Sequence, residues 1–123
     1  MFGKKKAKAP EDPRVELARN LVPKKHAGFD ANMGEVVKYI PGSSTILAVL
    51  PARGFSADCW ILTDKAIHLW SPLTQMVIPL NTNIVASKGI GSLKVGSNSS
   101  DTVSISAHPG NLDQFYQVLM SRL

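Results

Sequence analysis

The spacing of hydrophobic residues changes twice along the chain, from helical to strand-like and back to helical. Near the N-terminus, residues 11–22 place apolar side chains at helical spacing and end at Pro23, which predicts a short amphipathic helix capped by Asp12-Pro13. A second short helix is predicted from Asp30 to a stop at Pro41-Gly42. Its apolar face would consist of Met33, Val36, Val37 and Ile40.

Between residues 46 and 106 the pattern is strand-like, and turn-forming residues interrupt it regularly. Seven β-prone segments are predicted: 46–50, 57–62, 66–70, 75–80, 83–88, 92–95 and 102–106. Polar and apolar residues alternate in the last two, so each can cover a core with one face and meet water with the other. Pro79 and Asn81, between the fourth and fifth segments, indicate edge positions or a bend.

Two turns in this region carry specific expectations. Asp64, between the second and third segments, is expected to accept hydrogen bonds from nearby backbone amides and so close a tight hairpin. Residues 96–101 are expected to form a polar hairpin loop.

The last residues return to helical spacing. The apolar face of the predicted helix consists of Leu112, Phe115, Tyr116, Leu119 and Leu123. Asn111 is the predicted N-cap, and Gln114 lies where it could complete a capping-box exchange. The predicted fold class is therefore α+β, mainly β, with short N-terminal helices, about seven antiparallel strands and a C-terminal amphipathic helix.

Composition and size bound the class of protein. A length of 123 residues with 44% hydrophobic and 19% charged residues fits one compact soluble domain. We divide the chain into a basic tail, residues 1–28, and a folded domain, residues 29–123. The single cysteine, Cys59, excludes an internal disulfide and a zinc site built on paired cysteines, so we expect a cytoplasmic location. No activating base lies near Cys59 in the sequence, which favours a small buried side chain.

The net charge of +5 lies mostly in the first 40 residues, which hold nine basic and five acidic side chains. Its densest part is the run Lys4, Lys5, Lys6 and Lys8. Such a run could attract an anionic membrane surface, or it could be a solubilising tail, which is the interpretation we favour. The run lacks interleaved aromatic residues, so any contact with nucleic acid would be non-specific.

Candidate catalytic chemistry is sparse. His26, His68 and His108 have no carboxylate or thiol at ligand spacing, so no metal site is expected. Gly89-Ile90-Gly91 is followed by a strand pattern, whereas a dinucleotide-binding loop would open a helix. We therefore expect a protein that is not an enzyme and has no cofactor.

His68 and Trp70 are two residues apart in a predicted strand and so share one face. They could form a partner-binding patch, or His68 could be a histidine on a half-buried surface, which we favour. An enzymatic alternative would need a constellation of His68 with Asp58 or Asp64.

A series of motifs follows a fixed order from residue 41 onward. They are Pro41-Gly42, Ile46-Leu47-Ala48-Val49-Leu50-Pro51, Trp60-Ile61-Leu62-Thr63-Asp64-Lys65, Ile67-His68-Leu69, Val77-Ile78-Pro79-Leu80, Ile84-Val85-Ala86-Ser87 with Gly89, and the C-terminal helix. This order resembles the bacterial pleckstrin-homology-like (PH-like) domains of the YokE-like group, over roughly two thirds of the chain. The chain differs from the family at Ala66, where an arginine usually follows the lysine.

The resemblance implies a strongly bent antiparallel sheet, or partly open barrel, with one end plugged by the helix. Phe115, Tyr116 and Leu119 would then face the interior. It also implies a binding scaffold, used in relatives for protein contacts, self-association or lipid surfaces. Lipid-binding eukaryotic relatives gather basic residues around the first hairpin loop; here residues 52–57 offer only Arg53, so specific phosphoinositide recognition is not expected.

The functional prediction is a cytoplasmic, non-catalytic interaction module, bacterial or phage-borne, that binds a protein partner or itself through a sheet edge or loop rim. Pro79, Lys88 and Lys94 would restrict pairing at an exposed edge. The alternative is peripheral association with an anionic membrane at its inner face through the basic tail. The candidate contact residues are Lys4, Lys5, Lys6, Lys8, Arg53, His68 and Trp70.

Overall fold

Two antiparallel sheets make up most of the computed structural model, which describes residues 12–24, 33–54 and 56–123. One sheet has the strand order β1-β2-β3-β4 and the other has the order β5-β6-β7. The strands are β1 (Ile46–Pro51), β2 (Cys59–Thr63), β3 (Ala66–Trp70), β4 (Gln75–Pro79), β5 (Val85–Lys88), β6 (Ser92–Asn98) and β7 (Asp101–Ser106). Helix α1 (Pro13–Asn20) precedes them and helix α3 (Pro109–Met120) follows them. The predicted set of antiparallel strands followed by a C-terminal helix is confirmed, but the strands form two sheets, whereas the resemblance implies one strongly bent sheet.

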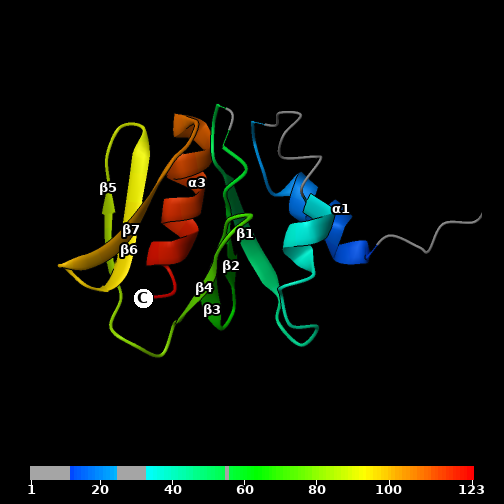
Figure 1. Cartoon of the computed structure of the whole chain (residues 1–123), viewed down its shortest axis with the longest axis horizontal. Coiled ribbons are helices and arrows are strands. Elements are labelled where there is room, and N and C mark those ends of the chain that lie inside the picture. Colours follow the sequence, from blue (N-terminus) through cyan, green and yellow to red (C-terminus); the bar gives the residue numbers. More distant parts are fainter. Residues whose placement is uncertain (1–11, 25–32, 55) are drawn as a thin grey trace, which may run out of the picture.

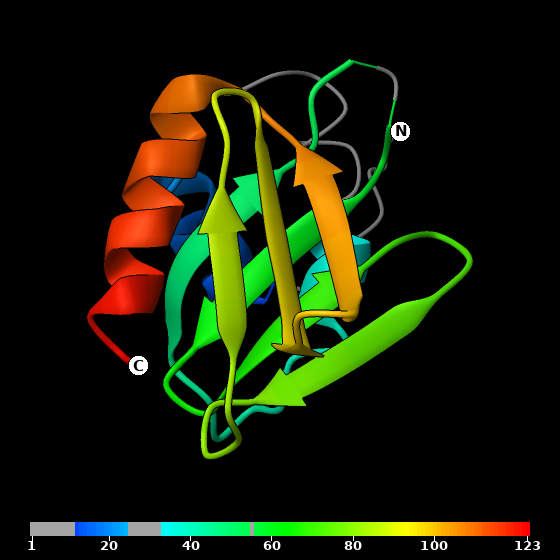
Figure 2. The ribbon, with the colours of Figure 1, turned by 90° about the vertical axis from the view of Figure 1, so that its left-hand side faces the viewer.

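The helices and sheets are arranged in layers. Figure 1 shows α1 on the outer side of the four-stranded sheet, and α3 with the three-stranded sheet on the inner side. In Figure 2 the three-stranded sheet crosses in front of the other sheet, and α3 runs along one side of the pair. Helix α3 therefore closes one side of the space between the two sheets, while no helix of the described residues lies over the side near β4 and β7.

The main core fills the space between the sheets and α3. Its buried side chains are Ala48, Leu50, Ala52, Trp60, Leu62, Ile67, Leu69, Ile78, Leu93, Val95, Ile105, Ala107, Leu112, Phe115 and Leu119. Alternate residues of β1 to β4 reach this core because successive side chains of a strand point to opposite faces. Phe115 and Leu119 are fully buried in it and Tyr116 is partly buried against it, as the resemblance led us to expect.

A second core covers the outer face of β1 and β2. Apolar side chains from α1 and from the helical residues 33–37 pack there against Ile46, Val49, Cys59 and Ile61. Strands β2 and β3 are therefore buried along their whole length. Both predicted N-terminal helices are present within the described residues, although Asp30 lies outside them. No helix in the described part of the chain is long and apolar enough to cross a membrane.

The turn between β2 and β3 is closed differently from the prediction. The Thr63 hydroxyl oxygen accepts hydrogen bonds from the backbone N–H of Lys65 at 3.2 Å and of Ala66 at 3.1 Å. The carboxylate of Asp64 instead accepts from the N–H of Thr45 at 2.8 Å. Asp64 thus holds the segment that enters β1, a contact across 19 residues that local turn chemistry does not reveal.

The loop predicted over residues 96–101 is also wrong. Strand β6 continues to Asn98, and only residues 99–100 form the turn. Gly96 pairs with Thr102 in the ladder. A Cβ at position 96 would meet the carbonyl oxygen of Asp101, so glycine is required for this close approach rather than for a loop.

The start of α3 also differs from the prediction. His108, not Asn111, is the N-cap, and its Nδ1 accepts from the N–H of Gly110 at 3.0 Å. Asn111 is buried in the first turn, where its Oδ1 accepts from the N–H of Lys24 at 2.8 Å and its Nδ2 donates to the Lys24 oxygen at 2.9 Å. The amide therefore joins the end of the N-terminal helical region to α3, and Asn111 performs no capping.

Candidate functional site

Strand β4 ends the four-stranded sheet, and its hydrogen-bond register shows which backbone groups it leaves free. The pair Ser71 and Thr74 exchanges two backbone hydrogen bonds, at 2.9 and 3.2 Å, and Leu80 donates to the Lys65 oxygen at 2.9 Å. Hydrogen-bonded and non-hydrogen-bonded pairs alternate along an antiparallel ladder. The backbone N–H and C=O groups of Gln75 and Val77 therefore point away from β3, toward the open side of the sheet.

The other end of the β4 edge is blocked. Pro79 occupies the next outward-facing position, where its missing N–H costs no ladder bond. Its carbonyl oxygen already accepts from the hydroxyl of Thr82 at 2.7 Å. The prediction that Pro79 marks an edge is confirmed, and the free part of the edge is the segment from Gln75 to Val77.

The free edge of β4 carries exposed apolar side chains. Met76 is 44% exposed and Val77 is 52% exposed, and Leu73 in the preceding turn is 94% exposed. By contrast, Lys88 on β5 pairs with Asp113 on α3, with 3.1 Å between Nζ and Oδ1. Strand β5 also exposes one large apolar side chain, Val85, at 36%, so β4, with Met76 and Val77, is the one of these two edge strands with more exposed apolar side chains.

The three residues that we expected to restrict an edge have different positions. Pro79 and Lys88 are both on edge strands, β4 and β5. Lys94 lies on β6, which pairs with a strand on each side. The expectation that Lys94 protects an edge is wrong, because the order β5-β6-β7 makes its strand the central one.

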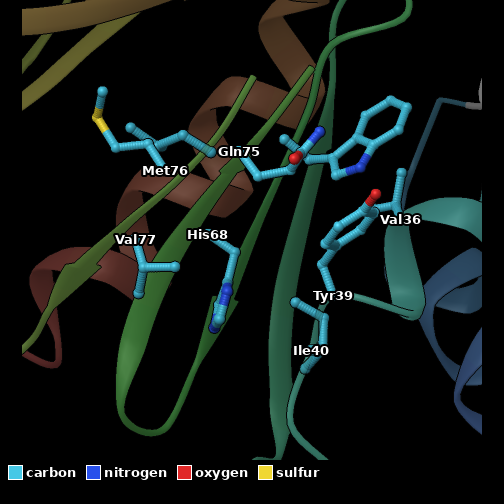
Figure 3. Close-up of a pocket in the computed structure, with 9 residues that line it drawn as sticks. Val36, Tyr39, Ile40, His68, Gln75, Met76 and Val77 are labelled. Carbon is cyan, nitrogen blue, oxygen red and sulfur yellow. The ribbon is translucent and has the colours of Figure 1, made fainter. Parts of the chain in front are cut away.

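An apolar hollow of about 80 Å³ lies beside β4 on the outer face of the sheet. Its lining comprises Val36, Tyr39, Ile40, His68, Leu69, Trp70, Gln75, Met76 and Val77. Figure 3 shows Gln75 and Tyr39 on the same side of β4, while Met76 extends to the opposite side. The hollow exists because the helical segment before β1 covers β1 and β2 but stops short of β4.

Trp70 and His68 share this outer face, as predicted. The ring centroids of Trp70 and Tyr39 are 6.4 Å apart at an angle of 49°. Trp70 is only 7% exposed, and its buried Nε1 has no hydrogen-bond acceptor among the described residues. Burial lowers the pKa of His68 below its ordinary value, which favours the neutral imidazole. The wall of the hollow is therefore almost wholly apolar, and the N–H of Trp70 is buried within the protein.

The inner side of β4 faces two larger hollows, between β4 and the three-stranded sheet. One, of about 280 Å³, is lined by Asp101, and the other, of about 200 Å³, by Asp58. Met76 and Val103 border both. No lysine or arginine of the described residues lines either hollow, and neither aspartate takes part in an ion pair among them. This side of β4 is therefore locally acidic, although the chain is basic overall.

The remaining predicted site residues lie elsewhere. Arg53 donates its backbone N–H to the Ser106 oxygen at 3.0 Å, on β7, and it does not line the hollow beside β4. Lys4, Lys5, Lys6 and Lys8 lie outside the described residues.

Burial raises the pKa of the Cys59 thiol, which agrees with a small buried side chain. In the part of the chain that the structure describes, no three His, Cys, Asp or Glu side chains are placed to hold a metal ion.

Sequence reasoning missed Tyr39, Gln75, Met76 and Val77 as site residues. One signal was available: Met76, Val77 and Ile78 are three consecutive apolar residues in a strand that Pro79 already marks as an edge. On such a strand at least one apolar side chain must face away from the main core. The contribution of Tyr39 has no such signal, because it depends on how the N-terminal helical region packs.

The known proteins give no independent guide to this site. Comparison with protein-family models, curated proteins and solved structures finds no match to the chain.

Proposed function

We propose that this protein is a non-catalytic interaction module that binds a partner protein by adding an extended segment of it to the free edge of β4. The observation that carries the proposal is the outward-facing N–H and C=O groups of Gln75 and Val77, beside exposed apolar side chains. An added strand would satisfy these groups and cover Met76 and Val77. The energy would come from backbone hydrogen bonds and from apolar surface removed from water.

The PH-like resemblance supports the same class of function and remains part of the proposal. The two sheets and the C-terminal helix that closes one side agree with such a scaffold at the level of architecture. Fold alone does not assign a function, so the proposal depends on the β4 edge rather than on the family.

The test introduces a proline that blocks the free edge of β4 without removing a hydrogen bond between β3 and β4. In Val77→Pro the lost N–H is one that faces outward, so the pairing of β3 with β4 is retained. Ala86→Pro on the other edge strand, β5, is the matched control. Gly89 donates its backbone N–H to the Ser92 oxygen, so the alternating hydrogen-bond register between β5 and β6 turns the N–H of Ala86 away from β6. A photo-crosslinking amino acid replaces Leu73, which is 94% exposed next to β4, and adducts are formed in living cells.

We expect one discrete protein adduct, which Val77→Pro removes and Ala86→Pro retains. An adduct that forms equally well with Val77→Pro would contradict binding at the β4 edge. Recovery of the chain with membranes, lost on replacing Lys4, Lys5, Lys6 and Lys8 by alanine and unaffected by Val77→Pro, would instead favour the membrane alternative. Circular dichroism of each purified variant checks that it is folded.

A further inference from the structure

We infer that the partner at the β4 edge is a second copy of this chain, whose own β4 pairs antiparallel with the first about a two-fold axis beside Met76. This inference rests on the proposed function and names the partner. It follows from three properties of β4: its hydrogen-bond register, its exposed side chains and its lack of charge.

The register of β4 is complementary to itself. With a two-fold axis beside Met76, Gln75 of each copy lies opposite Val77 of the other. Both residues direct their backbone N–H and C=O groups outward, so each pair exchanges two hydrogen bonds. An axis beside Val77 would instead place Gln75 opposite Pro79, which has no N–H. An axis beside Gln75 would place Val77 opposite Leu73, in the turn before β4. The Met76 axis therefore pairs every outward-facing group from Gln75 to Val77 within the strand.

The side chains near this axis are apolar and exposed. Met76 faces the second Met76 in a non-hydrogen-bonded pair, the kind in which side chains across an antiparallel ladder lie closest. Both lie on the inner side of the sheet, where Met76 borders hollows of about 280 and 200 Å³ that have room for a second flexible thioether. On the outer face, Val77 lies opposite the second Gln75, beside the apolar hollow that both residues line. Pairing therefore covers Met76 and Val77, which are 44% and 52% exposed.

The lack of charge on β4 favours pairing with a copy of itself. Near a two-fold axis each side chain meets its own kind, so a charged residue would face a like charge. Residues 66–87 contain no Asp, Glu, Lys or Arg, although 19% of the chain is charged. The acidic side chains of the inner hollows come from other segments, Asp58 before β2 and Asp101 on β7. Their like charges and the net charge of +5 on each copy oppose association at a distance, and salt screens both.

Two-fold pairing also closes the assembly. The β4 strand of each copy occupies that of the other, so neither β4 edge remains free to add a further chain. One short strand from each copy forms the contact, and a contact of this size belongs to the weak, transient class. The dimer is therefore expected to depend on protein concentration.

Sedimentation velocity of the full chain, from about 5 to about 500 μM, measures the dimer. We expect a monomer–dimer equilibrium whose dissociation constant rises at least about tenfold in Val77→Pro and is unchanged in Ala86→Pro, the matched proline on β5. The dimer should tighten as salt rises, because salt screens the repulsion between two copies of like net charge. Association through opposite charges would weaken instead.

A charge exchange tests the axis itself. Met76→Lys and Met76→Glu each place like charges opposite each other, so each variant alone should dimerise at least about tenfold more weakly. An equimolar mixture of the two should form a heterodimer, because opposite charges then face each other. Met76 is 44% exposed, so the core is retained, and circular dichroism checks that both variants are folded. Two variants that stay monomeric when mixed would overturn the Met76 axis.

The outcomes separate this inference from the proposed function. A chain that stays monomeric up to about 1 mM overturns the second copy as partner. The edge function then stands if the photo-crosslinked adduct at Leu73 contains another protein and is removed by Val77→Pro. A dimer that Val77→Pro leaves intact overturns the pairing through β4. Absence of both the dimer and an adduct sensitive to Val77→Pro overturns the inference and the proposed function together.

Discussion

Strands β4 and β5 follow each other in the chain and both end a sheet, yet their free edges differ. On β5, Lys88 carries a charge at the edge and pairs with Asp113 of α3. On β4, the exposed residues are Met76 and Val77, and the backbone groups of Gln75 and Val77 face outward. Natural proteins usually protect an exposed edge with charge or cover, because an open edge pairs with other chains. This contrast is the one on which the proposed strand pairing at β4 depends.

The largest expected effect is on the free energy of unfolding, and it distinguishes a residue of the main core from a residue on the β4 edge. Phe115 on α3 is fully buried in the main core, so Phe115→Ala should lower the free energy of unfolding by about 3–5 kcal/mol. Val77→Ala on β4 should change it by less than about 0.5 kcal/mol, because Val77 is half exposed. Urea unfolding followed by circular dichroism measures both. A large loss in Val77→Ala would mean that β4 has a structural role and would weaken the contrast.

The second effect concerns the buried indole N–H of Trp70 on β3. Trp60→Phe, in the main core, should cost about 1–2 kcal/mol through lost packing. Trp70→Phe should cost at least about 1 kcal/mol less, because it also removes a buried N–H that has no acceptor among the described residues. Thermal or urea unfolding of the two variants gives the comparison. Equal losses would show that the Trp70 N–H is satisfied in solution.

The third effect is a pH dependence that arises next to the β4 edge. Burial lowers the pKa of His68 below its ordinary value near 6.5, so the unfolded chain takes up this proton first as the pH falls. The stability contributed by neutral His68 is complete above about pH 6.5 and is lost as the pH falls toward the lowered pKa. The melting temperature should therefore fall less between about pH 7.5 and about pH 5.5 in His68→Gln than in the natural chain. Parallel curves for the two proteins would contradict this.

The smallest effect tests the protection of β5. Lys88→Ala removes the ion pair with Asp113 and should cost no more than about 1 kcal/mol, because the pair is partly exposed. It should also increase self-association at high protein concentration, since the edge loses its charge. Lys94→Ala is the matched control on the central strand and should not change association. Sedimentation velocity measures both variants, and an unchanged Lys88→Ala would show that α3 alone protects this edge.

Much of the fold can be predicted from local sequence. Hydrophobic periodicity predicts the strands and the helices, because burial on one face imposes a period of two on strands and about 3.6 on helices. Pro79 correctly predicts an edge, because a residue without an N–H is tolerated there. Placing His68 and Trp70 on one face also needs only the strand period.

The sequence by itself therefore determined the type and order of the elements, and the edge character of β4. The tertiary structure alone decided which partners the polar groups take: His108 caps α3, Asn111 binds Lys24, and Asp64 binds Thr45. It alone also decided that the hollow forms between Tyr39 and β4. The physical reason is that capping, register and cover depend on segments that meet only after folding, whereas periodicity is fixed by the geometry of each element on its own.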